Sequence, residues 1–278
     1  MHDGAATVES EMSDHVRVNR YERLNALLEL LAERGRIEVD DIAEELSASA
    51  ATIRRDLDHL AGQQLLTRTR GGAVAHAVSY DLPLRYKSVR HADEKQRIGA
   101  RAAALASRGS VVGLNGGTTA TEVARALATR PDLHETGSET ALTVVTNALN
   151  IANELAVRPQ VKLVVTGGVA RPQSYELIGP LGTKILDELT VDVTFLGVDG
   201  IDPESGAAAH HEGEASINRL LAERARKVVV VADSSKIGAR AFARICAPSE
   251  VNVLVTDVGA SMDDVRRFEE RGIEVIRV

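Results

Sequence analysis

Apolar positions recur at helical spacing in the first part of the chain and form short unbroken runs in the rest. Leucines repeat every three or four residues over 20–34, which predicts an amphipathic helix. The same spacing predicts a short helix over 39–46 and a third helix over 50–61, for which Ser49 supplies an N-cap. Two short strand-like runs around a pair of glycines then predict a β-hairpin over 65–74.

From residue 93 onward the pattern changes to strands alternating with helices. The predicted strands are 110–114, 142–146, 161–165, 193–198, 228–232, 252–256 and 273–278. The predicted helices are 93–107, 118–129, 148–157, 180–189, 214–225 and 261–271. Buried apolar strands that alternate with helices are typical of a mostly parallel sheet with helices on both faces. The fold class is therefore α/β, with a small helical unit in front.

These patterns divide the chain into four segments. We expect a flexible tail over 1–19, a winged helix-turn-helix over 20–76, a linker over 77–92 and an α/β domain over 93–278. The polar first segment does not read as a signal peptide, and no apolar run is long enough to span a membrane. The expected location is the cytoplasm.

Composition narrows the function classes. The chain has 278 residues, of which 44% are hydrophobic and 26% charged, as in an ordinary globular protein. Aromatic residues make up only 3%, which argues against a surface that stacks bases or sugar rings. The single cysteine, Cys246, excludes an intramolecular disulfide or a cysteine-rich zinc site and is expected to be a buried apolar residue.

The net charge of −7 argues at first against nucleic acid as a partner. Even the segment 20–75 contains eight basic and ten acidic residues. Within 51–72, however, there are four arginines and only two aspartates, and the other acidic residues lie mostly in the first two helices. Net charge reports solubility and non-specific binding rather than which face reads DNA. The acidity therefore predicts weak non-specific binding and does not exclude DNA.

The third helix carries the clearest functional pattern. At 100° per residue, Ile53, Leu57 and Leu60 fall on one side and should face the core. The polar side chains point elsewhere and make up the first part of a candidate DNA-binding set: Ser49, Thr52, Arg54, Arg55 and His59. An outward arginine on such a helix can reach guanine O6 and N7 in the major groove.

The predicted hairpin adds Arg68 and Arg70 beside its glycines, where a wing would meet the phosphate backbone. The alternative is a solvated helix face, in which Asp56 and Asp58 pair with the arginines of their own helix. The order of the elements favours DNA binding, because two helices, a tight turn, a capped helix and an arginine-bearing hairpin occur together.

In the α/β domain, polar and small residues follow the predicted strands. The carboxyl ends of parallel strands meet at one edge of a sheet, where ligands bind. The loop 115–119 opens a helix with small residues and hydroxyls, which suits a phosphate group. The candidate effector-binding residues are Asn115, Gly116, Gly117, Thr118, Thr119, Thr146, Asn147, Gly167, Gly168, Asp199, Glu214 and Lys236.

The same loops exclude some ligands. The loop 115–119 completes neither a Walker motif nor the Gly-x-Gly-x-x-Gly spacing of a dinucleotide site, so a small phosphorylated metabolite is favoured and no cofactor is expected. His210, His211 and Glu212 do not predict a metal site, because adjacent histidines diverge and no third ligand is evident.

Two motifs carry a specific resemblance. Thr52-Ile53-Arg54-Arg55-Asp56-Leu57, followed by Arg70-Gly71-Gly72-Ala73, resembles the DNA-binding signature of the DeoR family of bacterial transcriptional regulators. Ile42-Ala43-Glu44-Glu45-Leu46 also fits, whereas Ala48 stands where a valine is common. The resemblance continues to about residue 257. Its further motifs are Glu94-Lys95, the Gly-Thr-Thr loop, Thr146-Asn147, Gly167-Gly168, Phe195-Leu196-Gly197, Asp199-Gly200, Glu214-Ala215, Ser234-Ser235-Lys236 and Thr256-Asp257.

The resemblance implies a sensor domain similar in fold to ribose-5-phosphate isomerase that binds phosphorylated sugars or related metabolites. Asn115 departs from the aspartate common at that position. The expected function is a DNA-binding repressor of carbohydrate or polyol catabolism genes. Its expected partners are double-stranded operator DNA, a phosphorylated effector and further copies of itself in a dimer or tetramer.

Two other classes stay open. Asp199, Glu214 and Lys236 could form an acid–base set, which would make the protein a sugar-phosphate isomerase fused to a DNA-binding module. The resemblance favours binding over catalysis, because a fold alone does not establish an activity. In the third class, the helix-turn-helix would contact protein instead of DNA.

Overall fold

The computed structural model describes residues 19–63, 65–75, 84, 90–133 and 140–278. The chain divides into two compact units, Met1–Ser79 and Tyr80–Val278. All of the tail expected over 1–19 except Asn19, and most of the linker expected over 77–92, lie outside the described residues, so these two segments stay predictions. No described helix is long and apolar enough to cross a membrane.

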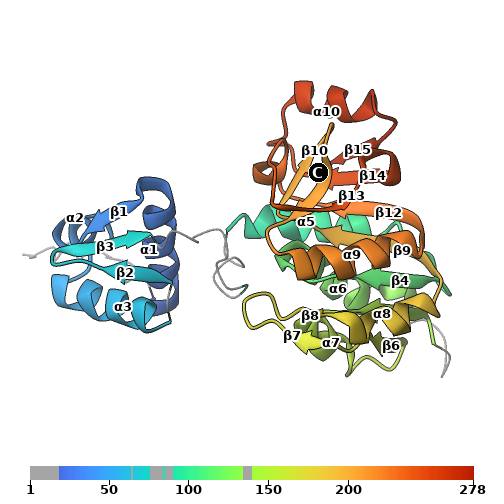
Figure 1. Ribbon diagram of the computed structural model, residues 1–278, viewed down its shortest axis with the longest axis horizontal. Helices are drawn as coiled ribbons and strands as arrows, with labels where there is room; N and C mark the ends of the chain where they lie inside the picture. The colour runs from blue at the N-terminus through green and yellow to red at the C-terminus, as the bar shows by residue number, and fades with distance from the viewer. Residues whose placement is uncertain (1–18, 64, 76–83, 85–89, 134–139) are drawn as a thin grey trace, which may run out of the picture. The chain divides into compact units, whose positions relative to one another are not determined.

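The described part of the first unit combines three helices with a small antiparallel sheet (Figure 1). Its elements are α1 (Arg20–Arg34), β1 (Arg36–Glu38), α2 (Val39–Glu45), α3 (Ala50–Gly62), β2 (Leu66–Arg68) and β3 (Gly72–Ala75). The predicted hairpin is formed by β2 and β3, and β3 also pairs with β1. This is the predicted winged helix-turn-helix. It contains one strand, β1, that was not predicted, because three residues are too few to show an alternating pattern.

Local signals in the sequence set the ends of these helices. The side chain of Asn19 accepts a hydrogen bond from the Glu22 N–H, and the Glu22 carboxylate accepts one from the Asn19 N–H, a capping box that starts α1. Gly35 ends α1 in the left-handed conformation that glycine adopts without strain. Ser49 caps α3 through the Thr52 N–H, as predicted.

The second unit is built on a sheet of seven parallel strands in the order β15-β14-β12-β9-β4-β5-β6. The strands are β4 (Val111–Leu114), β5 (Leu142–Thr146), β6 (Val161–Val165), β9 (Val191–Gly197), β12 (Ala225–Val231), β14 (Val253–Thr256) and β15 (Glu274–Arg277). Every neighbouring pair in this sheet runs parallel, which confirms the α/β fold class.

Helices cover both faces of the parallel sheet (Figure 1). One face packs against α5 (Ala92–Ala103), α6 (Thr118–Thr129) and α7 (Leu149–Leu155). The other packs against α8 (Pro180–Asp187), α9 (Glu212–Glu223) and α10 (Met262–Glu269). Along β12, Val229 and Val231 belong to the first core and Val228 and Val230 to the second. Strands buried on both faces read as continuous apolar runs, which is why the sequence revealed them.

Two smaller groups of strands were missed by the sequence patterns. A two-stranded hairpin, β7 (Val169–Ala170) with β8 (Leu177–Ile178), projects between β6 and α8. We call residues 169–178 the β7–β8 arm. A second sheet joins β10 (Gly200–Asp202), β11 (Gly206–Ala209) and β13 (Ala243–Cys246). These strands have two to four residues each, too few to show an alternating pattern.

Candidate functional site

Helix α3 presents the predicted faces. Ile53, Leu57 and Leu60 have no exposed surface, so they hold the helix against the core of the first unit. Arg54, Arg55 and His59 are exposed. Thr52 is half-buried, and its hydroxyl lies 2.9 Å from that of Ser49 at the start of the helix.

The two aspartates of α3 do not pair with the arginines of their own helix. Asp56 is buried and accepts a hydrogen bond from Arg23 of α1 at 2.6 Å, with Arg20 at 3.6 Å. Asp58 pairs instead with Arg68 of β2 at 2.8 Å. The alternative interpretation, in which the aspartates neutralise Arg54 and Arg55, is therefore wrong, because both carboxylates are turned toward other elements.

The four candidate arginines consequently differ in availability. Arg54 lies 3.9 Å from Asp40, while Arg55 forms no ion pair within the described part of the chain. Arg68 is held by Asp58 and also donates to the Gly72 carbonyl, so this guanidinium braces the hairpin against α3. Arg70 is exposed at the turn of the hairpin, again without an ion pair to any described residue. Arg55 and Arg70 are thus the side chains best placed to meet an external partner.

The turn that carries Arg70 depends on Gly72. Its N–H donates to the Thr69 hydroxyl, and its carbonyl accepts from the Thr69 N–H. A Cβ at residue 72 would lie 1.8 Å from the Ile37 carbonyl oxygen of β1. Only glycine lets β3 approach β1 this closely.

The parallel sheet brings the predicted effector loops to one edge. In spatial order, the strands β12, β9, β4, β5 and β6 end at Val231, Gly197, Leu114, Thr146 and Val165. Thr146 is the last residue of β5, Thr118 and Thr119 begin α6, and Glu214 lies in the first turn of α9, while the other candidate effector residues follow the strands directly or in a short turn. We call this edge the effector rim.

Asn115 joins two loops of the effector rim. Its side-chain amide donates to the Gly197 carbonyl at 2.9 Å, and its side-chain oxygen accepts from the Gly197 N–H at 2.7 Å. An aspartate here could accept but not donate, so asparagine satisfies both backbone groups. The departure from the family pattern therefore has a structural role, and both side-chain atoms are already hydrogen-bonded.

A buried polar cluster lies beside Asn115 and includes a residue that the sequence patterns did not reveal. Glu176, from the β7–β8 arm, accepts from the Gly116 N–H at 2.8 Å. Its other oxygen accepts from the side-chain amides of Asn147 and Asn218 at 3.2 and 3.3 Å. Glu176 is 4% exposed and Asn147 and Asn218 are each 2% exposed. We call these four residues the Glu176 cluster.

The environment of Glu176 disfavours its charge. Burial, together with the nearby Glu214 carboxylate, raises the pKa of Glu176 to about 8, although hydrogen bonds from Asn218, Asn147 and Gly116 oppose the rise. Glu214 is itself paired with Arg171 of the arm at 3.0 Å, and both side chains are 10% exposed. A carboxyl group at residue 176 is therefore protonated over much of the neutral range.

The remaining rim residues make backbone contacts. The Thr146 hydroxyl accepts from the Ala148 N–H, and Asp199 accepts from the His210 N–H. Gly167 and Gly168 adopt positive φ angles of 76° and 129° at the start of the arm. Lys236 lies in a short 3₁₀ turn after β12. The hydrogen bonds to Glu176 bring together Gly116 and Asn147 of the predicted set.

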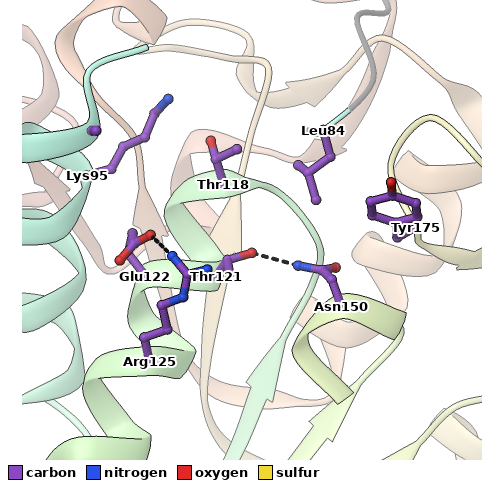
Figure 2. A pocket seen from close by; sticks show the side chains of 9 residues that line it. Leu84, Lys95, Thr118, Thr121, Glu122, Arg125, Asn150 and Tyr175 are labelled. Carbon is purple, nitrogen blue, oxygen red and sulfur yellow. Dashed lines mark hydrogen bonds and ion pairs between the residues drawn. The ribbon is translucent and has the colours of Figure 1, made fainter. Parts of the chain in front are cut away.

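An open pocket lies next to the rim, against the first turns of α6 (Figure 2). It has a volume of about 130 Å³ and is lined by Leu84, Ala92, Lys95, Thr118, Thr121, Glu122, Arg125, Asn150 and Tyr175. Lys95 and Thr118 both point into its upper part in Figure 2. Among the residues that line the pocket, Thr118 was predicted to bind the effector. Lys95, which belongs to the Glu94-Lys95 motif, was not.

Cys246 is buried on β13, and burial raises the pKa of its thiol to about 12. A thiol with this pKa stays protonated near neutrality and is a poor nucleophile. This agrees with the apolar role expected from the sequence.

Two family models match the two units separately. The DeoR-like helix-turn-helix domain matches residues 23–77, and the DeoR C-terminal sensor domain matches residues 90–258. The chain belongs to the DeoR family of transcriptional regulators. The resemblance seen in the recognition-helix and hairpin motifs is confirmed, and with it the role of a DNA-binding regulator.

DeoR-family relatives match over nearly the whole chain. The HTH-type transcriptional regulator GlpR of Haloferax volcanii is 34% identical over 256 residues, covering 92% of this chain and 96% of that protein. The glycerol-3-phosphate regulon repressor of Escherichia coli is 31% identical and covers 85% and 90%. The HTH-type transcriptional repressor GlcR of Bacillus subtilis is 31% identical and covers 92% and 95%.

Solved structures overlap with this DeoR-family chain at lower similarity. Ribose 5-phosphate isomerase A of Methanocaldococcus jannaschii is 22% identical, with a TM-score of 0.38 over 52% of this chain and 54% of that one. The full-length sorbitol operon regulator SorC of Klebsiella pneumoniae is 14% identical, with a TM-score of 0.39 over 90% and 99%.

Proposed function

We propose that this DeoR-family regulator represses genes of carbohydrate or polyol catabolism and responds to a phosphorylated sugar or a related metabolite. The observation that carries the effector class is the pocket at the start of α6, which both Lys95 and Thr118 line; the Lys95 ammonium also donates to the Arg90 carbonyl. A cation, a hydroxyl and a helix N-terminus are the groups that hold phosphate in proteins. The names of the relatives, among them a glycerol-3-phosphate regulon repressor, support the same class.

In the proposed DNA complex, α3 enters the major groove and the hairpin of β2 and β3 follows the backbone. Arg55 contacts guanine, Arg54, Thr52 and His59 contact neighbouring bases or phosphates, and Arg70 contacts a phosphate. Ser49 binds phosphate near its cap, and Arg68 supports the hairpin in addition to any phosphate contact. One short helix reads few bases, so a dimer or tetramer on symmetric half-sites supplies the specificity.

The proposed effector lies along the rim, with its phosphate at the Gly116–Thr119 loop and Lys95. The other candidate residues of the rim contact the sugar. One pocket residue links this region to the chain that precedes it. Leu84 lines the pocket, and its N–H donates to the Gln173 carbonyl of the β7–β8 arm at 2.7 Å. A ligand that displaces Leu84 therefore breaks its hydrogen bond to the arm.

The ion pair between Glu214 and Arg171 bears on the enzymatic alternative. An isomerase needs a carboxylate that is available to carry a proton between two substrate carbons. Here the Glu214 carboxylate is engaged by a guanidinium, which favours ligand binding over catalysis. Incubation with ribose 5-phosphate tests the alternative, since turnover that is lost in Glu214→Gln would support an enzyme.

A thermal-shift screen tests the effector class. We expect at least one phosphorylated sugar to raise the melting temperature of the full chain, while the matching free sugar does not, because only the phosphate reaches Lys95 and Thr118. A ligand at 100 times its Kd stabilises by about 2.7 kcal/mol, which is a shift of several degrees. Lys95→Met should remove the shift. A shift produced by the free sugar alone would contradict a phosphate-binding role for this loop.

A further inference from the structure

The Glu176 carboxylate lies where the sequence predicts the anion of the effector. The Gly116 N–H belongs to the loop that precedes α6, and it donates to Glu176 at 2.8 Å. The space beside this loop is filled, since a Cβ at residue 116 would lie 2.5 Å from the Glu176 side chain. An external anion cannot reach this N–H while Glu176 stays in place.

The Glu176 cluster has the chemistry of an oxyanion site. The three donors that the described residues supply to Glu176 are all neutral N–H groups, from Gly116, Asn147 and Asn218. They converge on two oxygens of one planar group. The same three donors and the positive N-terminal end of α6 would stabilise negative charge on the oxygens of a ligand.

One atom of the cluster is left without a partner. The side-chain oxygen of Asn147 is buried and accepts no hydrogen bond, although the residue is 2% exposed. A buried acceptor without a donor is costly, and such atoms usually mark a missing partner. Both Glu176 oxygens accept hydrogen bonds and neither donates to this oxygen, whereas a phosphate monoanion or a sugar hydroxyl can donate to it. The unpartnered acceptor therefore points to a ligand that the internal carboxylate imitates incompletely.

We propose that Glu176 is an internal competitor of the effector: an oxyanion binds Gly116, Asn147 and Asn218 only when the Glu176 side chain leaves them. This inference rests on the proposed function in one respect, that the effector enters at the rim. It adds a residue that sets the affinity of the site and that no motif of the sequence indicates. The competitor keeps the site closed to inorganic phosphate, and a larger effector displaces it through its additional contacts.

Energetics make the displacement feasible. Burial disfavours the ionised form of the Glu176 carboxyl, and the side chain can ionise and become fully hydrated when it moves into water. The charged groups packed around it are Glu214, from α9, and Arg171, from the arm, which pair with each other. Glu214 disfavours the charge of Glu176, and no ion pair to a described residue holds Glu176 in place. The arm carries Glu176, so its release also loosens the contacts of the arm with Asn147 and Leu149.

Inorganic phosphate is the probe that tests the competitor. Isothermal titration calorimetry on the full chain compares the wild type with Glu176→Ala and with Glu176→Gln, which keeps the packing volume. We expect at least tenfold tighter phosphate binding in both variants, because the occupied donors become available. Glu212→Gln removes an exposed carboxylate from the first turn of α9 and should leave the affinity unchanged.

Phosphate affinity that is unchanged in both Glu176 variants, or undetectable in all three proteins, would overturn the competitor. Thermal melts of each variant confirm that it is folded. The proposed function fails independently: if no phosphorylated sugar shifts the melting temperature of the wild type while Glu176→Ala still gains phosphate affinity, the competitor stands and the effector class is wrong. If the sugar phosphates bind and the variants gain nothing, only the competitor falls.

The pH dependence separates a competitor from a purely structural carboxyl. In the closed site the pKa of Glu176 is about 8, and in water it returns to its ordinary value of 4.5. Displacement of the side chain therefore releases a proton at any pH between these two values. The ratio of the wild-type phosphate Kd to that of Glu176→Gln should fall as pH rises from 5.5 to 8, by up to about tenfold per pH unit. The ionisation of phosphate itself cancels in this ratio. A ratio that stays flat or rises would contradict displacement of the carboxyl.

Discussion

Replacement of Arg55 by alanine is expected to abolish specific operator binding by the full chain while leaving its thermal unfolding unchanged. Arg55 is exposed and forms no ion pair within the described residues, so its loss leaves no buried group unsatisfied. A bidentate contact between arginine and guanine contributes about 1–3 kcal/mol of discrimination, which is roughly fivefold to 150-fold in affinity for each half-site. In a symmetric complex the two half-sites multiply this loss.

Fluorescence anisotropy with a labelled duplex, selected from a random pool by the wild-type protein, measures the effect. Arg266→Ala, an exposed arginine on α10 of the other unit, is the matched control and should bind like the wild type. The Arg70→Ala variant should instead weaken binding to all sequences alike and reduce the salt dependence by about one phosphate contact. Equal affinity of wild type and Arg55→Ala for the selected duplex would contradict the assignment of α3 as the recognition helix.

Replacement of Gly72 by alanine is expected to destroy the hairpin. The added Cβ would lie 1.8 Å from the Ile37 carbonyl oxygen and 2.8 Å from its carbon, and both are backbone atoms that no side-chain rotation can move away. Strands β1 and β3 must therefore separate, which costs their hydrogen bonds as well as packing. Overpacking alone costs about 1–3 kcal/mol, so we expect a loss of about 3 kcal/mol or more.

Gly71→Ala is the control for this prediction. A Cβ at residue 71 would meet the Glu38 carboxylate at 2.5 Å, which is the far end of a flexible and partly exposed side chain that can rotate away. Hydrogen exchange at the amides of β1 and β3, followed with the anisotropy assay, distinguishes the two variants. Fast exchange and weak DNA binding should appear in Gly72→Ala alone. Protection that survives in Gly72→Ala would show that the strands do not pair as closely as described.

The sequence was sufficient for features encoded within one element. The periodicity of Ile53, Leu57 and Leu60 predicted which face of α3 is buried, and all three are fully buried. The Ser49 cap was predicted from residue type and position, and the hydrogen bond to Thr52 is present. The strand edge that gathers the effector loops followed from the parallel topology, because every strand of the sheet ends on the same side.

Features that depend on contacts between distant segments could not be read in this way. Glu176 lies 60 residues from Gly116 in sequence and in a hairpin whose strands have two residues each, so no pattern connects the two. The pairing of Asp58 with Arg68 and of Asp56 with Arg23 likewise depends on how helices and strands pack. The sequence indicated that the aspartates of α3 could pair with arginines, but which arginines they pair with depends on the fold.

The acidic balance of the chain takes on a specific meaning in the structure. Asp56 and Asp58 lie on the same helix as Arg54 and Arg55, but their carboxylates are engaged by Arg23 and Arg68. The exposed guanidiniums of Arg55 and Arg70 are therefore not neutralised by these neighbours, although the whole chain carries a net charge of −7. Affinity for DNA then rests on a few placed arginines, and we expect non-specific binding to be weak.

The central claim is that one chain binds a specific duplex and that a phosphorylated sugar changes this affinity. Anisotropy of the selected duplex, titrated with the full chain at fixed salt with and without each sugar phosphate, tests it directly. We expect specific binding with a Kd of about 10⁻⁸ M or tighter, and at least a tenfold change with one sugar phosphate and none with its free sugar. A chain that selects no duplex, or whose affinity no sugar phosphate alters, would contradict this account.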